Sequence, residues 1–279
     1  MLPTLPKTAR SKLSPEISPH GREVETPHTK LLRVSLLVEE SSLYWQQRSL
    51  AWSKAECLER AFEERWFGNK SMSRVRSLLN EFGYRYDSYP NTLKILVEWQ
   101  PRDWLTRQNI CHWHLQLTDP LYRSFTDVFL NQRRIAQNPM VNRDIVARWV
   151  TQQQDKAWSV STTNRMATGL IASAAEAGLC SGETGDRSLS FSGVSDQALT
   201  YWLYVLKDLS FQGTLLNNPY WRSMGLTGSI LDQRLGRLSC LEFRRLADVY
   251  EFNWEYPDLT TWAISELGLE RVNFQEAAS

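Results

Sequence analysis

Apolar side chains recur at helical spacing throughout the first half of the chain, and several of these runs begin with a capping signal. Ser53 and Glu56 form a capping box, in which each side chain bonds the backbone N–H of the other residue. Further along, Asp119 precedes Pro120, which is the order of an N-cap residue and the first residue of a helix. The spacing therefore predicts an N-terminal helical bundle at residues 31–138.

The second half of the chain changes character. Asn142 and Ser161 are expected to cap two successive helices, the second of which ends at Gly178. Glycines and alternating apolar residues between 179 and 194 then predict a short β-hairpin. Helix, connection, helix and hairpin is the order of a winged helix-turn-helix unit. The sequence thus predicts a mainly α protein whose bundle precedes a winged-helix domain at 139–279, including a C-terminal helical and strand extension.

The C-terminal extension carries two further secondary-structure signals. Ser239 and Glu242 have the spacing of a second capping box, which predicts that a helix begins there. Tyr250, Phe252 and Trp254 alternate with polar residues, as in a β-strand.

The predicted helix at 162–177 carries the first candidate site. Its apolar residues gather on one face, and the opposite face is small and polar with one arginine near the helix start. Small side chains let a helix lie deep in the major groove, and arginine reads guanine or holds a phosphate. The candidate nucleic-acid contacts are Thr162, Thr163, Asn164 and Arg165, with Arg187 on the hairpin as a phosphate contact. A solvent-exposed helix has the same face, and many winged helices bind protein instead.

A second basic group surrounds the start of the helix expected at 73–82. Lys70, Arg74 and Arg76 lie there, together with hydroxyl and amide donors. Backbone N–H groups at a helix start favour phosphate, so these three residues are also candidate nucleic-acid contacts. The alternative is a solvated helix end.

The sequence offers no convincing catalytic or metal-binding motif. Cys111, His112 and His114 lie close together, but on a helix they do not share one face, and no second pair of ligands follows in sequence. The chain has no Walker loop, no GxSxG, no GxGxxG and no HExxH. We therefore expect a protein that is not an enzyme, with no metal and no cofactor. A nuclease built on Asp and Glu alone remains the catalytic alternative.

Charge and hydropathy narrow the class of protein. The 32 Lys and Arg residues nearly balance the 31 Asp and Glu residues, which argues against a strongly basic nucleic-acid coat protein but permits a local basic patch. No apolar run approaches the roughly 20 residues of a membrane span, and the N-terminus has no apolar signal core. We expect a cytoplasmic protein without a membrane partner. Residues 1–30 are rich in Pro, Ser, Thr and charge, which predicts a flexible tail.

The chain has 12 tryptophans, spread over its whole length. We expect most of them to fill the core between helices, because these large side chains bury much apolar area. Tryptophans exposed at the surface would instead indicate an interface or a nucleic-acid stacking site.

The chain resembles the BrxA family of bacterial BREX phage-exclusion systems from about Leu32 to Trp262. The resemblance rests on Asn69 and on these segments: Ser35-Leu-Leu-Val-Glu-Glu-Ser41, Ser73-Arg-Val-Arg76, Pro90-Asn-Thr-Leu-Lys-Ile-Leu96, Asp119-Pro-Leu-Tyr-Arg-Ser-Phe-Thr-Asp-Val128, Ser159-Val-Ser-Thr-Thr-Asn-Arg-Met166 and Ala174-Ala-Glu-Ala-Gly-Leu179. These are patterns of a helical protein and not a catalytic fingerprint.

The resemblance implies winged-helix architecture, DNA binding and an accessory, non-catalytic part in phage defence. It also implies that partner subunits such as a methyltransferase or an ATPase perform the chemistry. The expected function is therefore that of a double-stranded DNA-binding component of a BREX-like system. Two alternatives stay open: a scaffold that docks other defence subunits, and an RNA-binding helical protein.

Overall fold

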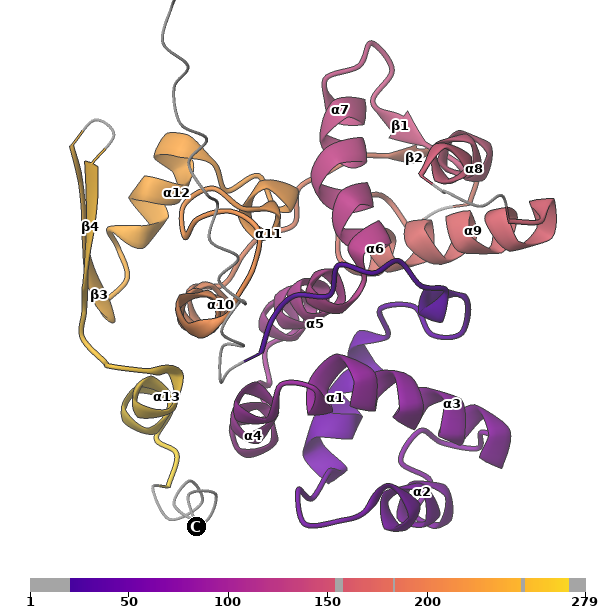
Figure 1. Cartoon of the computed structure of the whole chain (residues 1–279), viewed down its shortest axis with the longest axis horizontal. Coiled ribbons are helices and arrows are strands. Elements are labelled where there is room, and N and C mark those ends of the chain that lie inside the picture. The colour runs from indigo at the N-terminus through magenta and orange to yellow at the C-terminus, as the bar shows by residue number, and fades with distance from the viewer. Residues whose placement is uncertain (1–20, 154–157, 183, 247–248, 271–279) are drawn as a thin grey trace, which may run out of the picture.

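The computed structural model describes residues 21–153, 158–182, 184–246 and 249–270, and helices dominate them (Figure 1). The first half of the chain folds into η1 (Lys30–Leu32), α1 (Val38–Gln47), α2 (Lys54–Glu63), α3 (Met72–Phe82), the π-helical turn η2 (Gly83–Asp87), α4 (Pro90–Trp99) and α5 (Trp104–Thr118). A nearly continuous run follows: α6 (Pro120–Ser124), the π-helical η3 (Phe125–Phe129) and α7 (Leu130–Arg134).

Two predicted helix starts are confirmed. The Ser53 hydroxyl accepts from the Glu56 N–H at 3.3 Å, and the Glu56 carboxylate accepts from the Ser53 N–H at 2.8 Å. Asp119 accepts from the N–H of Tyr122 at 2.9 Å, and Pro120 is the first residue of α6. Both signals are local, since each cap and its donor lie three residues apart.

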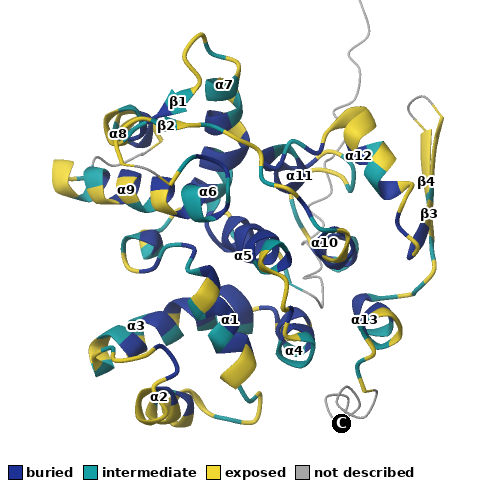
Figure 2. Ribbon diagram, turned by 180° about the vertical axis from the view of Figure 1, so that it is seen from behind, coloured by how far each residue is buried: buried dark blue, intermediate teal, exposed yellow. Residues whose placement is uncertain are grey.

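Helix α5 forms the centre of the molecule. Every residue from Gln108 to Thr118 is buried, which is typical of a helix that is covered on all sides. Helices α1, α6 and α10 and the turn η2 pack against it. Figure 2 shows α5 in dark blue between the two halves of the chain. Since α5 contacts elements of both halves, the bundle and the C-terminal part share one core.

The next elements form a small unit beside the bundle. They are β1 (Met140–Val141), α8 (Arg143–Gln152), α9 (Val160–Glu176) and β2 (Arg187–Ser188). Strands β1 and β2 are antiparallel neighbours, with Val141 opposite Arg187. The N–H of Ser181 donates to the carbonyl of Ser188 at 2.9 Å, so residues 179–181 pair with the other edge of β2. Helices α8 and α9 pack tightly on each other.

The predicted hairpin is therefore present in part, and one predicted helix start is wrong. Cys180 forms an antiparallel bridge with Leu189, as a hairpin at 179–194 requires. The expected cap of α9, Ser161, lies inside the helix instead. Ser159 is the N-cap, and its hydroxyl accepts from the N–H of Thr162 at 3.2 Å.

The C-terminal part contains α10 (Asp196–Asp208), α11 (Pro219–Ser223), α12 (Gly228–Leu235), β3 (Leu241–Leu246), β4 (Val249–Trp254) and α13 (Leu259–Leu267). Strands β3 and β4 form a hairpin that lies along one edge of the molecule (Figure 1). The strand predicted around Phe252 is confirmed. The helix start predicted at Ser239 and Glu242 is wrong, because Glu242 pairs with Asn253 across the hairpin.

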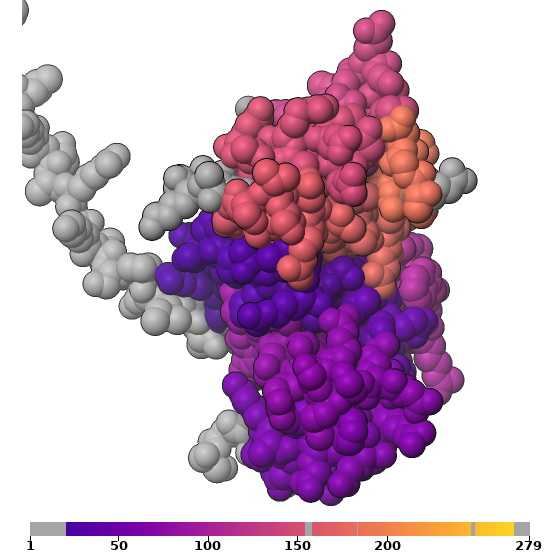
Figure 3. All heavy atoms as spheres, turned by 90° about the vertical axis from the view of Figure 1, so that its right-hand side faces the viewer, coloured from indigo at the N-terminus to yellow at the C-terminus, as the bar shows by residue number. Residues whose placement is uncertain are grey.

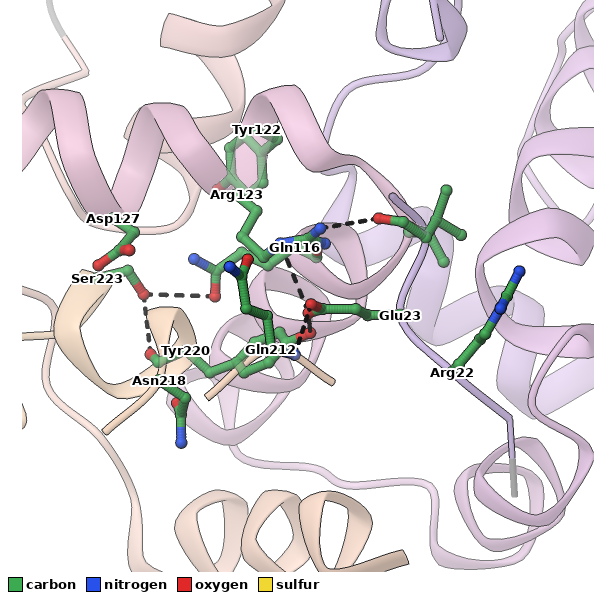
Figure 4. A network of polar contacts seen from close by, with 12 residues as sticks. Arg22, Glu23, Gln116, Tyr122, Arg123, Asp127, Gln212, Asn218, Tyr220 and Ser223 are labelled. Carbon is green, nitrogen blue, oxygen red and sulfur yellow. Dashed lines mark hydrogen bonds and ion pairs between the residues drawn. The ribbon is translucent and has the colours of Figure 1, made fainter. Parts of the chain in front are cut away.

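The described part of the predicted tail, residues 21–30, packs against the fold (Figure 4). The Glu23 carboxylate is buried and accepts from the Tyr220 hydroxyl at 2.6 Å and from the backbone N–H of Gln212 at 2.8 Å. Arg123 lies 3.6 Å from the same carboxylate and donates to the carbonyl of Val24 at 2.8 Å. These bonds join the segment to both halves of the chain. The prediction of a flexible tail at 1–30 is therefore wrong for residues 21–30, and residues 1–20 lie outside the described part of the chain.

Most tryptophans fill the core, as predicted. Trp45, Trp113, Trp202 and Trp221 are fully buried, and the Trp113 and Trp202 rings stack at 5.8 Å. Trp104 is the exception, with 44% of its surface exposed. The tryptophans thus account for packing and do not form a broad surface patch.

Candidate nucleic-acid interface

A basic groove runs along α9, where the helix meets η1 and α3. It encloses about 730 Å³. Figure 3 looks onto this side of the molecule, with α8 and α9 above the indigo N-terminal segment and the purple bundle below. The groove is lined by Leu31, Leu32, Arg33, Ser35, Arg74, Arg143, Val160, Ser161, Asn164, Arg165, Thr168, Gly169 and Ala172. Among these described residues four are arginines and none is acidic, but Arg33 pairs with Glu81 and Arg143 with Asp144, each at 3.7 Å, outside the groove lining.

Close packing of α9 on η1 builds the groove. A side chain at Gly169 would place its Cβ 3.1 Å from the carbonyl oxygen of Leu31, so glycine permits the close approach of helix and backbone. The Arg74 guanidinium donates to the carbonyl of Arg33 at 2.7 Å, and the Arg165 guanidinium reaches the carbonyl of Leu32 at 3.4 Å. Arginines from α3 and α9 therefore converge on one short segment.

The floor of the groove is the exposed stripe of α9. Ser161, Arg165, Thr168 and Ala172 are exposed at helical spacing, and Asn164 is half-buried beside them. Their side chains are small apart from one arginine. Such a stripe leaves room for a ligand to approach the helix backbone.

Two predicted contacts on α9 are not presented to the groove. Thr163 is buried, because the helix begins at Val160 and turns this residue toward the core. Thr162 is half-buried, and its hydroxyl bonds the N-cap hydroxyl of Ser159 at 2.9 Å. Asn164 and Arg165 do line the groove, as the sequence predicted.

A second hollow of about 560 Å³ flanks the other side of the stripe. Arg143, Thr168 and Ala172 line both hollows, and Arg187 lines the second. Arg187 is half-buried and donates to the carbonyl of Ser181 at 3.3 Å. Asp144 and Asp186 also line this hollow, so it is less basic than the groove.

The structure separates the other two basic candidates from the groove. Lys70 pairs with Glu40 at 3.6 Å, which partly neutralises it. Arg76 lines a different cavity. Arg33 and Arg143 were missed by the sequence reasoning. Arg143 follows the N-cap Asn142 at the start of α8, a position that already favours anions, and this signal could have identified it.

Cys111, His112 and His114 of α5 are all buried in the core. Tyr122 and Ser223 lie within 2.9 and 3.0 Å of the two ring nitrogens of His112, and the Tyr201 hydroxyl lies 2.8 Å from Nε2 of His114. Burial, together with the charges of nearby arginines, lowers the pKa of both histidines to about 3. Both are therefore neutral at pH 7.

The depressed pKa values predict acid lability. Between pH 6.5 and 3 the unfolded chain binds protons at these histidines and the folded chain does not, so stability falls as the pH is lowered through this window. Each histidine contributes a slope of up to about 1.4 kcal/mol per pH unit. Urea unfolding at several pH values measures it. The His112→Asn, His114→Asn variant is expected to show a shallower pH dependence, and an unchanged slope would contradict the assignment.

None of the helices in the described ranges is long and apolar enough to cross a bilayer. Comparison with known proteins finds no match among curated proteins or solved structures. The sequence pattern of the family described as BrxA matches residues 28–195, a range that contains all the residues that line the α9 groove. Since this match spans well over half of the chain, the chain belongs to the BrxA family of BREX phage-defence systems.

Proposed function

We propose that the protein is a non-catalytic BREX component that binds double-stranded DNA through the α9 groove. The order of α7, β1, α8, α9, the strand residues 179–181 and β2, with β1 paired to β2, supports a winged-helix interpretation. In that arrangement α9 enters the major groove, and the loop between Ser181 and Arg187 acts as the wing.

The observation that carries the proposal is the set of four arginines around the stripe of α9. Arg33 and Arg74 stand on one side, Arg143 stands on the other, and Arg165 lies on the helix itself. Guanidinium groups bind phosphate oxygens in a planar, two-pronged geometry, and small residues allow the helix to approach base edges. The net charge of +1 therefore conceals a local concentration of positive charge.

Salt dependence tests the proposal. Four phosphate contacts give a log–log slope of affinity against salt of about −3.6. We expect a slope near this value when a labelled 30-base-pair duplex is titrated by fluorescence anisotropy between 50 and 300 mM NaCl. A slope near zero, or no binding at 50 mM, would contradict the proposal. Equal affinity for duplex RNA would favour the RNA alternative, because the deep, narrow major groove of A-form RNA does not admit a helix.

Docking to other BREX subunits, such as a methyltransferase or an ATPase, is the second candidate. The last described pair of the β3–β4 hairpin favours it, since Leu246 is 83% exposed and Val249 is 73% exposed. Neighbouring exposed apolar side chains are suited to a protein partner. If this candidate holds, replacing both residues by serine removes subunit binding and leaves duplex binding unchanged.

A further inference from the structure

Arg76, which the DNA proposal does not use, lines a second basic cavity. Helix α3 separates this cavity from the α9 groove, since Arg74 and Arg76 are two residues apart and point to different sides of the helix. The cavity encloses about 680 Å³, within the range of small-molecule sites. Its walls come from α1, α2, α3, η2 and the start of η1.

Positive charge dominates the cavity. Lys30, Arg48, Lys54 and Arg76 line it, and among its described residues Asp87 is the one carboxylate. Asp87 is already engaged, because it accepts from the Tyr44 hydroxyl at 2.5 Å and lies 3.5 Å from the Arg48 guanidinium.

Two of these cations are available to a ligand. The side chains of Lys54 and Arg76 are exposed and have no hydrogen bond or ion pair to any described residue. They stand on neighbouring helices, α2 and α3, and both face the same cavity. This pair is therefore suited to an anion with more than one charged oxygen.

One wall of the cavity is apolar and aromatic and begins one helical turn from the two cations, because Leu58 follows Lys54 on α2 and Leu79 follows Arg76 on α3. Leu58 and Leu79 line it, together with the half-buried ring of Tyr84. The ammonium group of Lys30 lies over one face of this ring, 4.0 Å from its centroid. Tyr84 belongs to the π-helical turn η2, a rare geometry that is frequent at functional sites. The side-chain amide of Asn80 supplies a donor and an acceptor beside this wall.

We propose that this cavity binds a nucleoside phosphate, with the base against the apolar wall and the phosphates on Lys54 and Arg76. An apolar surface next to paired cations matches the two chemically different ends of such a molecule. The site is separate from the α9 groove, and the inference stands without the DNA proposal.

Isothermal titration calorimetry of the full chain with ATP tests the inference. We expect one molecule of ATP to bind per chain, and both adenosine and inorganic triphosphate to bind at least about tenfold more weakly than ATP. The variant Lys54→Ala, Arg76→Ala is expected to lose at least about tenfold in ATP affinity, since each residue contributes a charge-assisted bond. Arg102→Ala, at an exposed arginine outside the cavity, serves as the matched control.

Three results would overturn the inference. The first is no ATP binding at millimolar concentration. The second is triphosphate binding as tightly as ATP, which would remove the role of the base. The third is ATP affinity that survives Lys54→Ala, Arg76→Ala but is lost in Arg74→Ala, Arg165→Ala, which would place the ligand in the α9 groove. Duplex binding by the cavity variant is expected to equal that of the wild type, so failure of this inference is distinguishable from failure of the DNA proposal.

Discussion

Replacing Arg74 and Arg165 together by alanine is expected to weaken duplex DNA binding about tenfold to a hundredfold at 100 mM salt. The two residues belong to α3 and α9, yet they converge on consecutive carbonyls of the segment that follows Leu31. Each loss removes one phosphate contact, so the log–log salt slope is expected to become shallower by about 1.8. Fluorescence anisotropy over a salt series measures both quantities.

Matched variants separate charge from structure. The variant Arg74→Lys, Arg165→Lys keeps both charges, so its salt slope is expected to stay near that of the wild type. Arg102→Ala alters an exposed arginine outside the groove and is expected to bind like the wild type. Wild-type affinity in the double alanine variant would rule out the groove as the DNA site.

Replacing Glu23 by alanine is expected to lower the free energy of unfolding by about 3–5 kcal/mol. The carboxylate is buried and is held by Arg123, Tyr220 and the backbone of Gln212. Its removal leaves the largely buried Arg123 guanidinium without its counter-charge and the buried Tyr220 hydroxyl without its acceptor, and such losses are costly. Urea denaturation at pH 7 gives the change.

The neighbouring Glu25 supplies the control for this stability prediction. Glu25 is exposed, so Glu25→Ala is expected to change stability by less than about 0.5 kcal/mol. Glu23→Gln keeps one carbonyl acceptor and is expected to fall between the two. If Glu23→Ala costs less than about 1 kcal/mol, residues 21–30 are not an integral part of the fold.

Much of the helical architecture could be predicted, because its signals are local. The capping box at Ser53 and the Asp119–Pro120 start involve residues within one helical turn. The same kind of signal was misleading at Ser239, where residues of the capping-box type lie beside a strand held by cross-strand pairs. At α9 two serines two residues apart both preceded the apolar pattern, and the backbone geometry selected Ser159.

The tail shows what local patterns miss. Residues 21–30 have few apolar side chains, which predicted disorder, but their order comes from a buried carboxylate and from backbone bonds to Leu117 and Ser210. Those partners lie about ninety residues or more further along the chain. Strand β1 was also missed, because two residues are too few to show an alternating pattern.

The candidate site could be predicted only in pieces. Arg74 and Arg165 were identified separately, each at the start of its own helix. Their convergence depends on the packing of α9 on η1 at Gly169, a tertiary contact that no spacing in the sequence reveals. Arg33 lies in a segment without any motif and becomes a candidate only through that contact.

Tethered cleavage of DNA tests most directly whether α9 faces the duplex. The native cysteines at 57, 111, 180 and 240 are all buried, so a cysteine introduced at exposed Thr168 can be labelled selectively with an iron chelate that generates hydroxyl radicals. If α9 faces the duplex, we expect cleavage of bound DNA from Thr168→Cys and none from Glu63→Cys, an exposed position on α2. Equal cleavage from both positions, or no cleavage from Thr168→Cys while the duplex remains bound, would contradict it.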